Sequence, residues 1–334
     1  MEQNKAGKKQ LKINGSMLVL LCALGIVVGV FTFLNKNFFS YTNMVNVFVA
    51  ASLVGLVAIG ETYLIIAGLN DLSPGSVAAF SGVLAAILTS NFGLNFGLSV
   101  IITIVVASLA GLFNAWMVSK IKLQPFIATL VTQAVFRGLA YIICDGKPVA
   151  VTNETFINLG KARVGGSSGI PVTVILLIIA FLIFGFILAR TRFGRSIYAI
   201  GGNVDAARLA GLKPNKVIVI TYLLMSCLCA LGGTILAARM NSGQPAACVN
   251  LEFDAITAVI LGGVSFNGGI GNMMGTFLGV ILIQAFNTGL TMVQVPTFWQ
   301  YVARGLLLLA ALTIDYLRKA NREKKLLQDS MKNL

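Results

Sequence analysis

Long apolar runs separated by short polar or charged segments fill almost the whole chain. A helix needs about 20 predominantly apolar residues to cross the hydrocarbon core of a membrane. Runs of suitable length predict ten membrane helices over residues 17–34, 43–66, 75–90, 96–118, 126–143, 171–189, 217–237, 254–265, 273–292 and 298–316. The eighth run is short, which favours a broken or re-entrant helix there. The pattern predicts an all-α polytopic membrane protein.

Composition supports this interpretation and defines the domain organisation. Hydrophobic residues make up 57% of the 334 residues and charged residues 11%, whereas charged residues make up about a quarter of a soluble domain. No run is left for a separate soluble domain. The expected parts are a basic tail (1–16), a transmembrane domain (17–316) with polar loops at 144–170 and 190–216, and a second basic tail (317–334).

Several kinds of chemistry are excluded by what the sequence lacks. It contains no histidine, which rules out histidine metal sites and Ser-His triads. It contains no G-x-x-x-x-G-K-[ST] phosphate-binding loop, so energy from ATP would have to come from another subunit. No metal-ligand spacing is found among the five cysteines, which are Cys22, Cys144, Cys227, Cys229 and Cys248.

The distribution of positive charge predicts the orientation in the membrane. Ten spans place both termini on one side, and the segments on that side hold 18 of the 25 Lys and Arg residues, against 5 on the other side. Cytoplasmic loops carry the excess of Lys and Arg. Both termini and the segment 190–216 are therefore expected in the cytoplasm. The same distribution argues against nucleic acid as the reason for the net charge of +14.

Two Gly-rich interruptions, at 68–75 (GLNDLSPG) and 262–271 (GGVSFNGGIG), each precede a helix rich in small residues. Non-helical backbone at membrane depth survives only where protein or a water-filled cavity satisfies it. Paired breaks in the two halves suggest an internal repeat around a pathway. Tight cytoplasmic turns between short helices would explain the same pattern, and the sequence leaves both interpretations open.

The basic loop at residues 190–216 carries six Lys and Arg residues and the end signals of a short helix. Asn203 is a suitable N-cap because its side chain accepts a backbone N–H. Asp205 in the first turn and Arg208 near the end match the two poles of the helix dipole. Gly211 provides a left-handed stop. These signals predict a helix of about two turns over residues 204–210.

A helix of two turns is marginal alone in water, so this one must dock onto something. Its side chains are mostly small, with Ala206, Ala207 and Ala210, which permits close approach. The pattern fits docking either on the protein's own cytoplasmic face or on a partner subunit.

At this helix the chain resembles a known family. Asp205-Ala-Ala and Gly211 resemble the cytoplasmic coupling motif of ABC-importer permeases, and Arg192–Asn203 is similar to the sugar permeases of the ribose, xylose and galactose type. Further similar stretches follow in the family's order: Asp71–Ser76, Pro125–Leu130, Phe136–Ala140, Ser242–Pro245, Asp254–Ile256 and Gly262–Gly269. Leu69 and Asn70 depart from the family's usual Gly-Ile, and Ile270 stands where Lys or Arg is common.

The resemblance implies a permease subunit of an ATP-driven, binding-protein-dependent importer in the bacterial cytoplasmic membrane. The implied cargo is a monosaccharide, pentose or hexose, and Val264–Phe266 and Phe298–Tyr301 look more like the galactose branch. The implied partners are an ABC ATPase subunit, an extracytoplasmic sugar-binding protein and a second permease copy. No catalytic residue, cofactor or metal is implied. The residues implied to contact the ATPase are Asn203, Asp205, Ala206, Ala207, Arg208 and Gly211.

Charges within the predicted spans are candidates for a pathway. A charge at mid-membrane costs at least about 2.5–3.5 kcal/mol, so each needs a partner or water. Arg137 and Arg304 lie inside spans, and Glu252 and Asp254 lie at the outer start of the eighth. Matched depth and opposite sign predict that Arg304 or Arg137 pairs with Asp254 near the outer mouth. A pair that only fixes helix packing fits the same pattern.

Other polar side chains have two interpretations each. Glu61 either faces a pathway or lies in an interface between helices, and Asp71 is expected to cap the helix that begins near Ser73. The amides of the spans either bind sugar hydroxyls or bond across helices. The expected pathway or gate residues are Glu61, Asp71, Asn114, Phe136, Arg137, Asp254, Asn287, Gln300 and Arg304.

Three alternatives remain open at this point. The paired breaks also fit an ion-driven secondary transporter, although Glu61 is the only carboxylate clearly inside a span. A membrane scaffold without a pathway would share the composition. The same importer type could also carry nucleosides or branched-chain amino acids, because much selectivity resides in the binding protein.

Overall fold

The computed structural model describes residues 15–166 and 169–332, which are almost entirely helical. The helices are α1 (Gly15–Leu34), α2 (Tyr41–Ile66), α3 (Pro74–Ala86), α4 (Phe96–Trp116), α5 (Pro125–Ile142), α6 (Glu154–Lys161), α7 (Val172–Arg190), α8 (Arg192–Gly202), α9 (Val204–Leu209), α10 (Pro214–Met240), α11 (Leu251–Leu261), α12 (Met273–Met292) and α13 (Thr297–Lys332). A 3-10 turn covers Lys36–Phe39, and π-helical turns extend α3 over Ile87–Asn91 and α4 over Met117–Ile121.

Each of the ten predicted spans coincides with a helix, which confirms the all-α polytopic class. In the described part of the chain, eight helices are long and apolar enough to cross a membrane: α1, α2, α4, α5, α7, α10, α12 and α13. The other two predicted spans fall on α3 and α11, which are shorter. The eighth predicted span, residues 254–265, is therefore a helix of 11 residues that begins earlier and ends at the Gly-rich segment.

The core lies around α2 and α10. The α10 helix packs against α2, α3 and α4, and α2 is buried along most of its length. The peripheral helices α1, α4, α5, α7 and α13 expose many Leu, Ile, Val and Phe side chains. Exposed apolar side chains on spanning helices are expected where they contact lipid or another membrane subunit.

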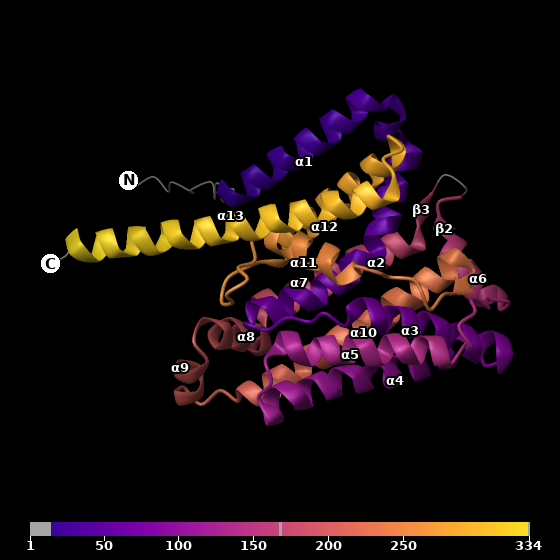
Figure 1. Cartoon of the computed structure of the whole chain (residues 1–334), viewed down its shortest axis with the longest axis horizontal. Helices are drawn as coiled ribbons and strands as arrows, with labels where there is room; N and C mark the ends of the chain where they lie inside the picture. Colours follow the sequence, from indigo (N-terminus) through magenta and orange to yellow (C-terminus); the bar gives the residue numbers. More distant parts are fainter. Residues whose placement is uncertain (1–14, 167–168, 333–334) are drawn as a thin grey trace, which may run out of the picture.

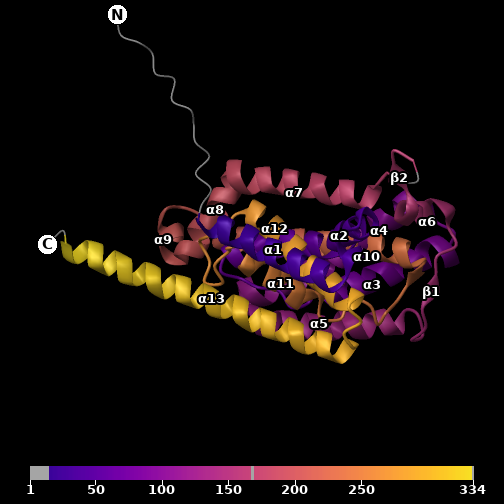
Figure 2. The same ribbon diagram turned by 90° about the horizontal axis from the view of Figure 1, so that it is seen from above.

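The two ends of the bundle carry different structures. Helices α8 and α9 lie at one end of the long axis, and α6 lies at the other with the short strands (Figures 1 and 2). Strands β1 (Val149–Ala150) and β4 (Ser242–Gly243) pair there, as do β2 (Arg163–Val164) and β3 (Ile170–Pro171). The start of α1 and the end of α13 lie at the α9 end (Figure 1).

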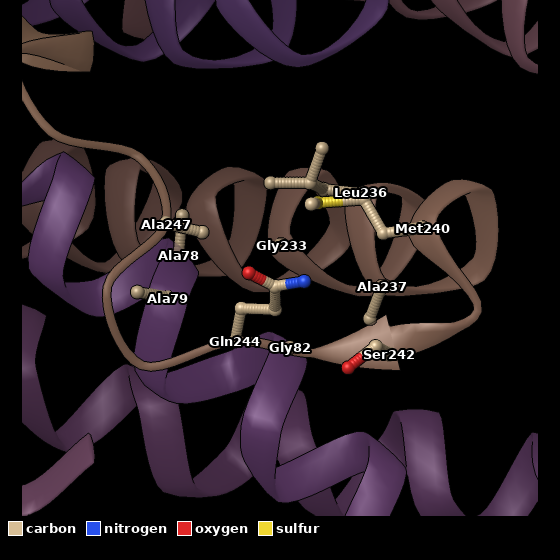
Figure 3. Close-up of a pocket in the computed structure, with 10 residues that line it drawn as sticks. All are labelled: Ala78, Ala79, Gly82, Gly233, Leu236, Ala237, Met240, Ser242, Gln244 and Ala247. Atoms are coloured by element: carbon tan, nitrogen blue, oxygen red, sulfur yellow. The ribbon is translucent and has the colours of Figure 1, made fainter. Parts of the chain in front are cut away.

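Small residues allow α3 and α10 to cross closely. A β-carbon at Gly233 would collide with the carbonyl oxygen of Ala78. The segment that follows β4 lies along this crossing, with Gln244 beside Gly82 and Gly233 (Figure 3). The gap among these residues is about 10 Å³, which admits at most one water molecule. The crossing is thus a packed helix interface and has no room for a solute.

Candidate translocation pathway and coupling site

The helix predicted over 204–210 forms, and its ends are as the sequence indicates. Asn203 Oδ1 accepts the backbone N–H groups of Asp205 and Ala206, at 3.0 and 2.9 Å. Gly211 takes the left-handed conformation with φ of 83°. The helix α9 ends one residue earlier than predicted, because Ala210 serves as the C-cap.

One of the residues predicted to contact the ATPase is not on the exposed face of α9. Ala207 is only 5% exposed and packs against the protein itself, so its side chain cannot contact a partner in this structure. Leu209, which the sequence analysis did not select, is 90% exposed. Arg208 and Asp205 form an exposed ion pair at 3.2 Å. Leu209 is thus a large apolar side chain that the chain itself leaves almost uncovered.

A second helix, α8, connects α9 to the membrane helices and was not predicted. Thr191 Oγ1 caps its start by accepting from the Gly194 N–H at 3.2 Å. Its last residues, Gly201 and Gly202, immediately precede the Asn203 cap of α9. The end of α8 is therefore directly connected to the start of α9.

The end of α8 meets both Gly-rich breaks in one place, which we call the glycine junction (Ile66, Gly68, Gly201, Gly268 and Gly269). The Gly269 N–H donates to the Ile66 carbonyl at 2.8 Å. A β-carbon on Gly201 would collide with the Ile66 carbonyl oxygen and lie 2.7 Å from Gly269 N. A β-carbon on Gly268 would lie 2.8 Å from Gly201 O and 3.1 Å from Gly68 Cα. Three backbone segments approach this closely because Gly68, Gly201, Gly268 and Gly269 carry no side chains.

Two tyrosines also tie the breaks to neighbouring helices. Tyr198 on α8 donates its hydroxyl to the Gly271 carbonyl at 2.8 Å, and Tyr222 on α10 donates to the Asn70 carbonyl at 3.0 Å. Burial raises the pKa of Tyr198 above its usual range, so this hydroxyl stays protonated and remains a donor. Both breaks are thus held by hydrogen bonds from outside their own segments.

The first break is organised around Asp71. Its Oδ1 accepts from the backbone N–H of Ser73 at 2.7 Å and from the Ser73 hydroxyl at 2.6 Å. Asn114 on α4 donates to Asp71 Oδ2 at 3.3 Å, and Thr132 on α5 donates to Asn114 Oδ1 at 2.5 Å. Asp71 fixes the turn at Ser73, just before α3, but it does not cap the helix as predicted, because the first turn of α3 has no side-chain cap. Asn114 bonds across helices.

An extended segment lies between β4 and α11, just before the eighth predicted span. A β-carbon at Gly243 would lie 2.7 Å from Gly82 O, and one at Gly75 would touch Cys248 O. The segment from Gly243 to Cys248 therefore runs back along α3 from Gly82 to Gly75, about 10 Å at the rise of a helix. Non-helical backbone at this depth must be satisfied by protein or by a water-filled cavity.

Arg137 on α5 satisfies part of this segment. Its Nη1 donates to the carbonyl oxygens of Pro245 and Ala247, both at 2.7 Å. Arg137 therefore does not pair with Asp254, which was one of the two predicted pairings. A guanidinium has five donors and suits several carbonyl acceptors at once.

A cavity of about 410 Å³ lies beside Arg137, between α3, α5 and the start of α11. Its lining is Ser76, Leu130, Gln133, Ala134, Arg137, Val249, Asn250 and Glu252. A second cavity, about 520 Å³ between α7 and α12, is lined almost entirely by apolar side chains. The cavity beside Arg137 is therefore the one suited to a polar solute, since binding sites combine apolar walls with a few placed polar groups.

Asp254 forms a separate cluster with the last two helices. Arg304 on α13 lies 3.5 Å from its Oδ2, and Asn287 on α12 donates to the same oxygen at 3.2 Å. Glu252 and Asp254 point in different directions because two residues along a helix correspond to a rotation of about 200°. The Asp254 cluster joins α11, α12 and α13.

Reversing the charges of Asp254 and Arg304 tests whether the attraction between these two side chains stabilises the protein. We expect Asp254→Arg or Arg304→Asp alone to lower stability by roughly 1.5–3 kcal/mol, since each leaves a charge without its partner. The double reversal should recover most of this loss. The measurement is the fraction of each variant that stays monodisperse after heating, determined by size-exclusion chromatography in detergent. A double variant as unstable as the worse single variant would contradict the pairing.

The remaining predicted pathway residues lie in other places. Glu61 is fully buried and neither of its carboxylate oxygens makes a hydrogen bond. Phe136 packs edge-on against Phe80 with ring centres 5.3 Å apart, so it fills the interface between α3 and α5. Gln300 donates to the Val295 carbonyl at 2.8 Å and closes the turn before α13. None of these three lines the cavity beside Arg137.

Two polar residues that were not predicted as site residues, Gln133 and Asp315, make contacts between distant parts of the chain. Gln133 donates to Glu252 Oε1 at 3.0 Å across 119 residues of sequence. Asp315 on α13 accepts the Phe266 N–H at 3.0 Å and so anchors the second break. A lone carboxylate in the last span was the available signal for Asp315, whereas nothing in the local pattern distinguishes Gln133.

Comparison with known proteins adds independent evidence. The family described as branched-chain amino acid transport system / permease component matches residues 43–312. The ribose import permease protein of Bacillus subtilis is 39% identical over 323 residues, covering 96% of this chain and 99% of that protein. The L-arabinose transport system permease protein of Escherichia coli K12 is 38% identical over 307 residues, 92% of each chain.

A ribose import permease protein of Haemophilus influenzae is 36% identical over 297 residues, covering 88% of this chain and 91% of that protein. No solved structure gives a significant match. The resemblance to sugar permeases is thereby confirmed. By the extent of these matches and by its bundle of spanning helices, the chain is a multi-pass membrane permease that belongs to the branched-chain amino acid transport system / permease component family.

Proposed function

We propose that this chain is the membrane-spanning subunit of an ATP-driven importer that moves a monosaccharide into the cytoplasm, supplied by an extracytoplasmic binding protein. Relatives named for ribose and L-arabinose import cover almost the whole chain. Both sugars are pentoses, which favours a pentose over the galactose-like hexose suggested by Val264–Phe266 and Phe298–Tyr301. The observation that carries the mechanism is the glycine junction, which connects α9 to both helix breaks.

A separate ATPase subunit supplies the energy in this proposal. The chain has no phosphate-binding loop of its own. The exposed residues of α9, with Leu209 at their centre, form the docking surface for that subunit. Positive charge is concentrated in the segments at the α9 end, which supports placing this end and both termini in the cytoplasm.

Movement of the ATPase would reach the membrane through α8. Because Gly201 contacts Ile66 and Gly269, a shift of α9 displaces the ends of α2 and of the second break together. Phe266 within the second break is also bonded to Asp315 of α13. Packed contacts of this kind support two alternative arrangements rather than continuous deformation. The breaks are the parts that would change between the outward-open and inward-open states.

The pathway in this proposal follows the non-helical segments. Asp71, Asn114 and Arg137 hold the backbone that borders it, and the cluster of Asp254, Asn287 and Arg304 fixes the helices around it. A second copy of the chain would complete the pathway. The exposed apolar faces of α4 and α5 support association with another membrane subunit.

Uptake measurements test the proposed function. A strain lacking this gene, complemented with the wild-type chain, should accumulate radiolabelled D-ribose or L-arabinose. Uptake should persist when a protonophore collapses the proton gradient while ATP is maintained, and stop when ATP is depleted. Accumulation of leucine but neither pentose would show a different cargo, and loss of uptake with the proton gradient alone would favour an ion-driven transporter.

A further inference from the structure

Two short helices begin beside each other inside the bundle. Helix α3 begins at Pro74 after the first break, and α11 begins at Leu251 after the extended segment. A β-carbon at Gly75 would lie 2.6 Å from Glu252 Oε2, so the first turns of the two helices are in contact. The N-terminal turns of interrupted helices offer unpaired backbone N–H groups and a partial positive charge.

Polar atoms without partners lie at this point. Glu252 is 3% exposed, and its Oε2 makes no hydrogen bond although its Oε1 accepts from Gln133. Ser76 is fully buried, and its hydroxyl also makes no hydrogen bond. A buried polar group without a partner costs free energy, so most such groups in proteins are paired. Both groups line the same cavity of about 410 Å³.

The rest of the lining suits a neutral solute with several hydroxyl groups. Gln133 and Asn250 contribute amide groups, which donate to and accept from neighbouring hydroxyls, and Arg137 contributes a guanidinium, which donates to them. Leu130 and Val249 contribute apolar surface for the ring. The volume falls within the range of about 300–1,000 Å³ that is typical of small-molecule sites. The one carboxylate in the lining, Glu252, has the positive charge of Arg137 within electrostatic reach.

We propose that this cavity is a transit site for a monosaccharide, in which Glu252 Oε2 accepts a sugar hydroxyl and the Ser76 hydroxyl bonds to a neighbouring one. The proposal rests on the proposed function and adds the residues that recognise the cargo. The site is built from the first turns of α3 and α11, each preceded by a non-helical segment. Movement of the breaks would therefore change the site directly.

The geometry favours brief occupancy. Glu252 Oε1 and Arg137 Nη1 are already used by Gln133 and by the extended segment, so only part of their capacity is left for a solute. Conduction requires sites that bind well enough to admit the solute and weakly enough to release it. A site with one free carboxylate oxygen and one free hydroxyl meets that requirement.

Glu252→Gln tests the carboxylate with little change of shape. Its carbonyl can still accept from Gln133, but an amide N–H₂ then faces the position of the sugar hydroxyl. In proteoliposomes holding the whole transporter, we expect D-ribose or L-arabinose uptake to fall about tenfold, because a hydrogen bond to a charged group is replaced by a weaker neutral one. ATPase stimulation by the loaded binding protein should stay within about twofold of wild type, because the effect is confined to the pathway. The matched control is Glu154→Gln, at the first turn of exposed α6.

A second measurement does not depend on transport or on the folding of that variant. In a chain with its five cysteines replaced, Ala134→Cys places a thiol in the cavity lining. We expect millimolar D-ribose or L-arabinose, but not an equal concentration of betaine, to slow its labelling by a hydrophilic thiol reagent. The control Val164→Cys, on β2 and outside the cavity lining, should be labelled equally with and without sugar.

The results of these experiments distinguish a failure of the proposed sugar site from a failure of the proposed import function. Wild-type-like uptake in Glu252→Gln, or labelling of Ala134→Cys that neither sugar slows, overturns the site. Absence of ATP-dependent uptake of any pentose or hexose by the wild type overturns the proposed function, and the labelling result then decides the site alone. Loss of uptake in Glu252→Gln together with protection of Ala134→Cys supports the site.

Discussion

Replacing Gly201 with alanine is expected to abolish uptake. The new β-carbon would collide with the carbonyl oxygen of Ile66 and lie 2.7 Å from the Gly269 nitrogen. Both neighbours are backbone atoms, so no side chain can rotate away to make room. The end of α8 would have to move away from both helix breaks, and the Gly269–Ile66 hydrogen bond would be strained or lost. Overpacking of this kind typically costs about 1–3 kcal/mol.

The adjacent glycine provides the control. A β-carbon at Gly202 would meet nothing within 4 Å. Gly202→Ala should therefore insert, fold and transport like wild type, although it lies in the same turn. Uptake and heat stability are to be measured on matched amounts of membrane protein. If Gly201→Ala transports normally, the glycine junction is not a rigid contact between α9 and the breaks.

A Gly201→Ala variant that still folds would test how ATP hydrolysis is coupled to sugar movement. If Gly201→Ala folds and still stimulates ATP hydrolysis with its partner, yet moves no sugar, then the junction transmits movement rather than only holding the fold. Loss of protein from the membrane would instead show that the contact is needed for folding. The Gly202→Ala control separates either result from a general effect of adding a methyl group to this turn.

Much of the fold could be predicted because its signals are local. Apolar runs of about 20 residues give the spanning helices, and the cap at Asn203 with the left-handed Gly211 gives α9 to within one residue. The extended segment before α11 could not be predicted in this way. In this non-helical segment, the carbonyl groups of Pro245 and Ala247 are satisfied by Arg137, which is far away in the sequence. That contact does not appear in any local pattern.

The site was predicted less well than the fold for the same reason. Charge and depth identified Asp254 with Arg304, but the same argument admitted Arg137, which bonds to backbone instead. Phe136 came from the family resemblance of residues 136–140, and Gln300 from its polar side chain at a span end. In the structure Phe136 packs against Phe80, and Gln300 bonds to the Val295 carbonyl. Gln133 gains its role only when α5 meets α11, so a single sequence carries no sign of it.

Replacing Leu209 with aspartate is expected to prevent docking of the ATPase while leaving the membrane domain folded. Leu209 is 90% exposed at the end of α9, so its loss removes few contacts within the chain. Burying a leucine on a partner contributes about 1.5–3 kcal/mol. A carboxylate at that position would lose this term and would also have to be desolvated. We expect affinity for the ATPase subunit to fall by about a hundredfold or more.

Leu209→Met is the matched control, because methionine keeps the apolar surface and a similar volume. It should retain at least about half of the uptake, since volume-conserving apolar changes usually cost under about 1.5 kcal/mol. Co-purification of the ATPase with the tagged permease measures docking, and heat stability of the permease alone shows that the fold is intact. Co-purification of Leu209→Asp at the wild-type level would mean that the exposed face of α9 is not the ATPase contact. The proposed route runs from α9 through Gly201 to both breaks. Without an ATPase contact at α9, the energy of ATP would have to enter the membrane domain by another route.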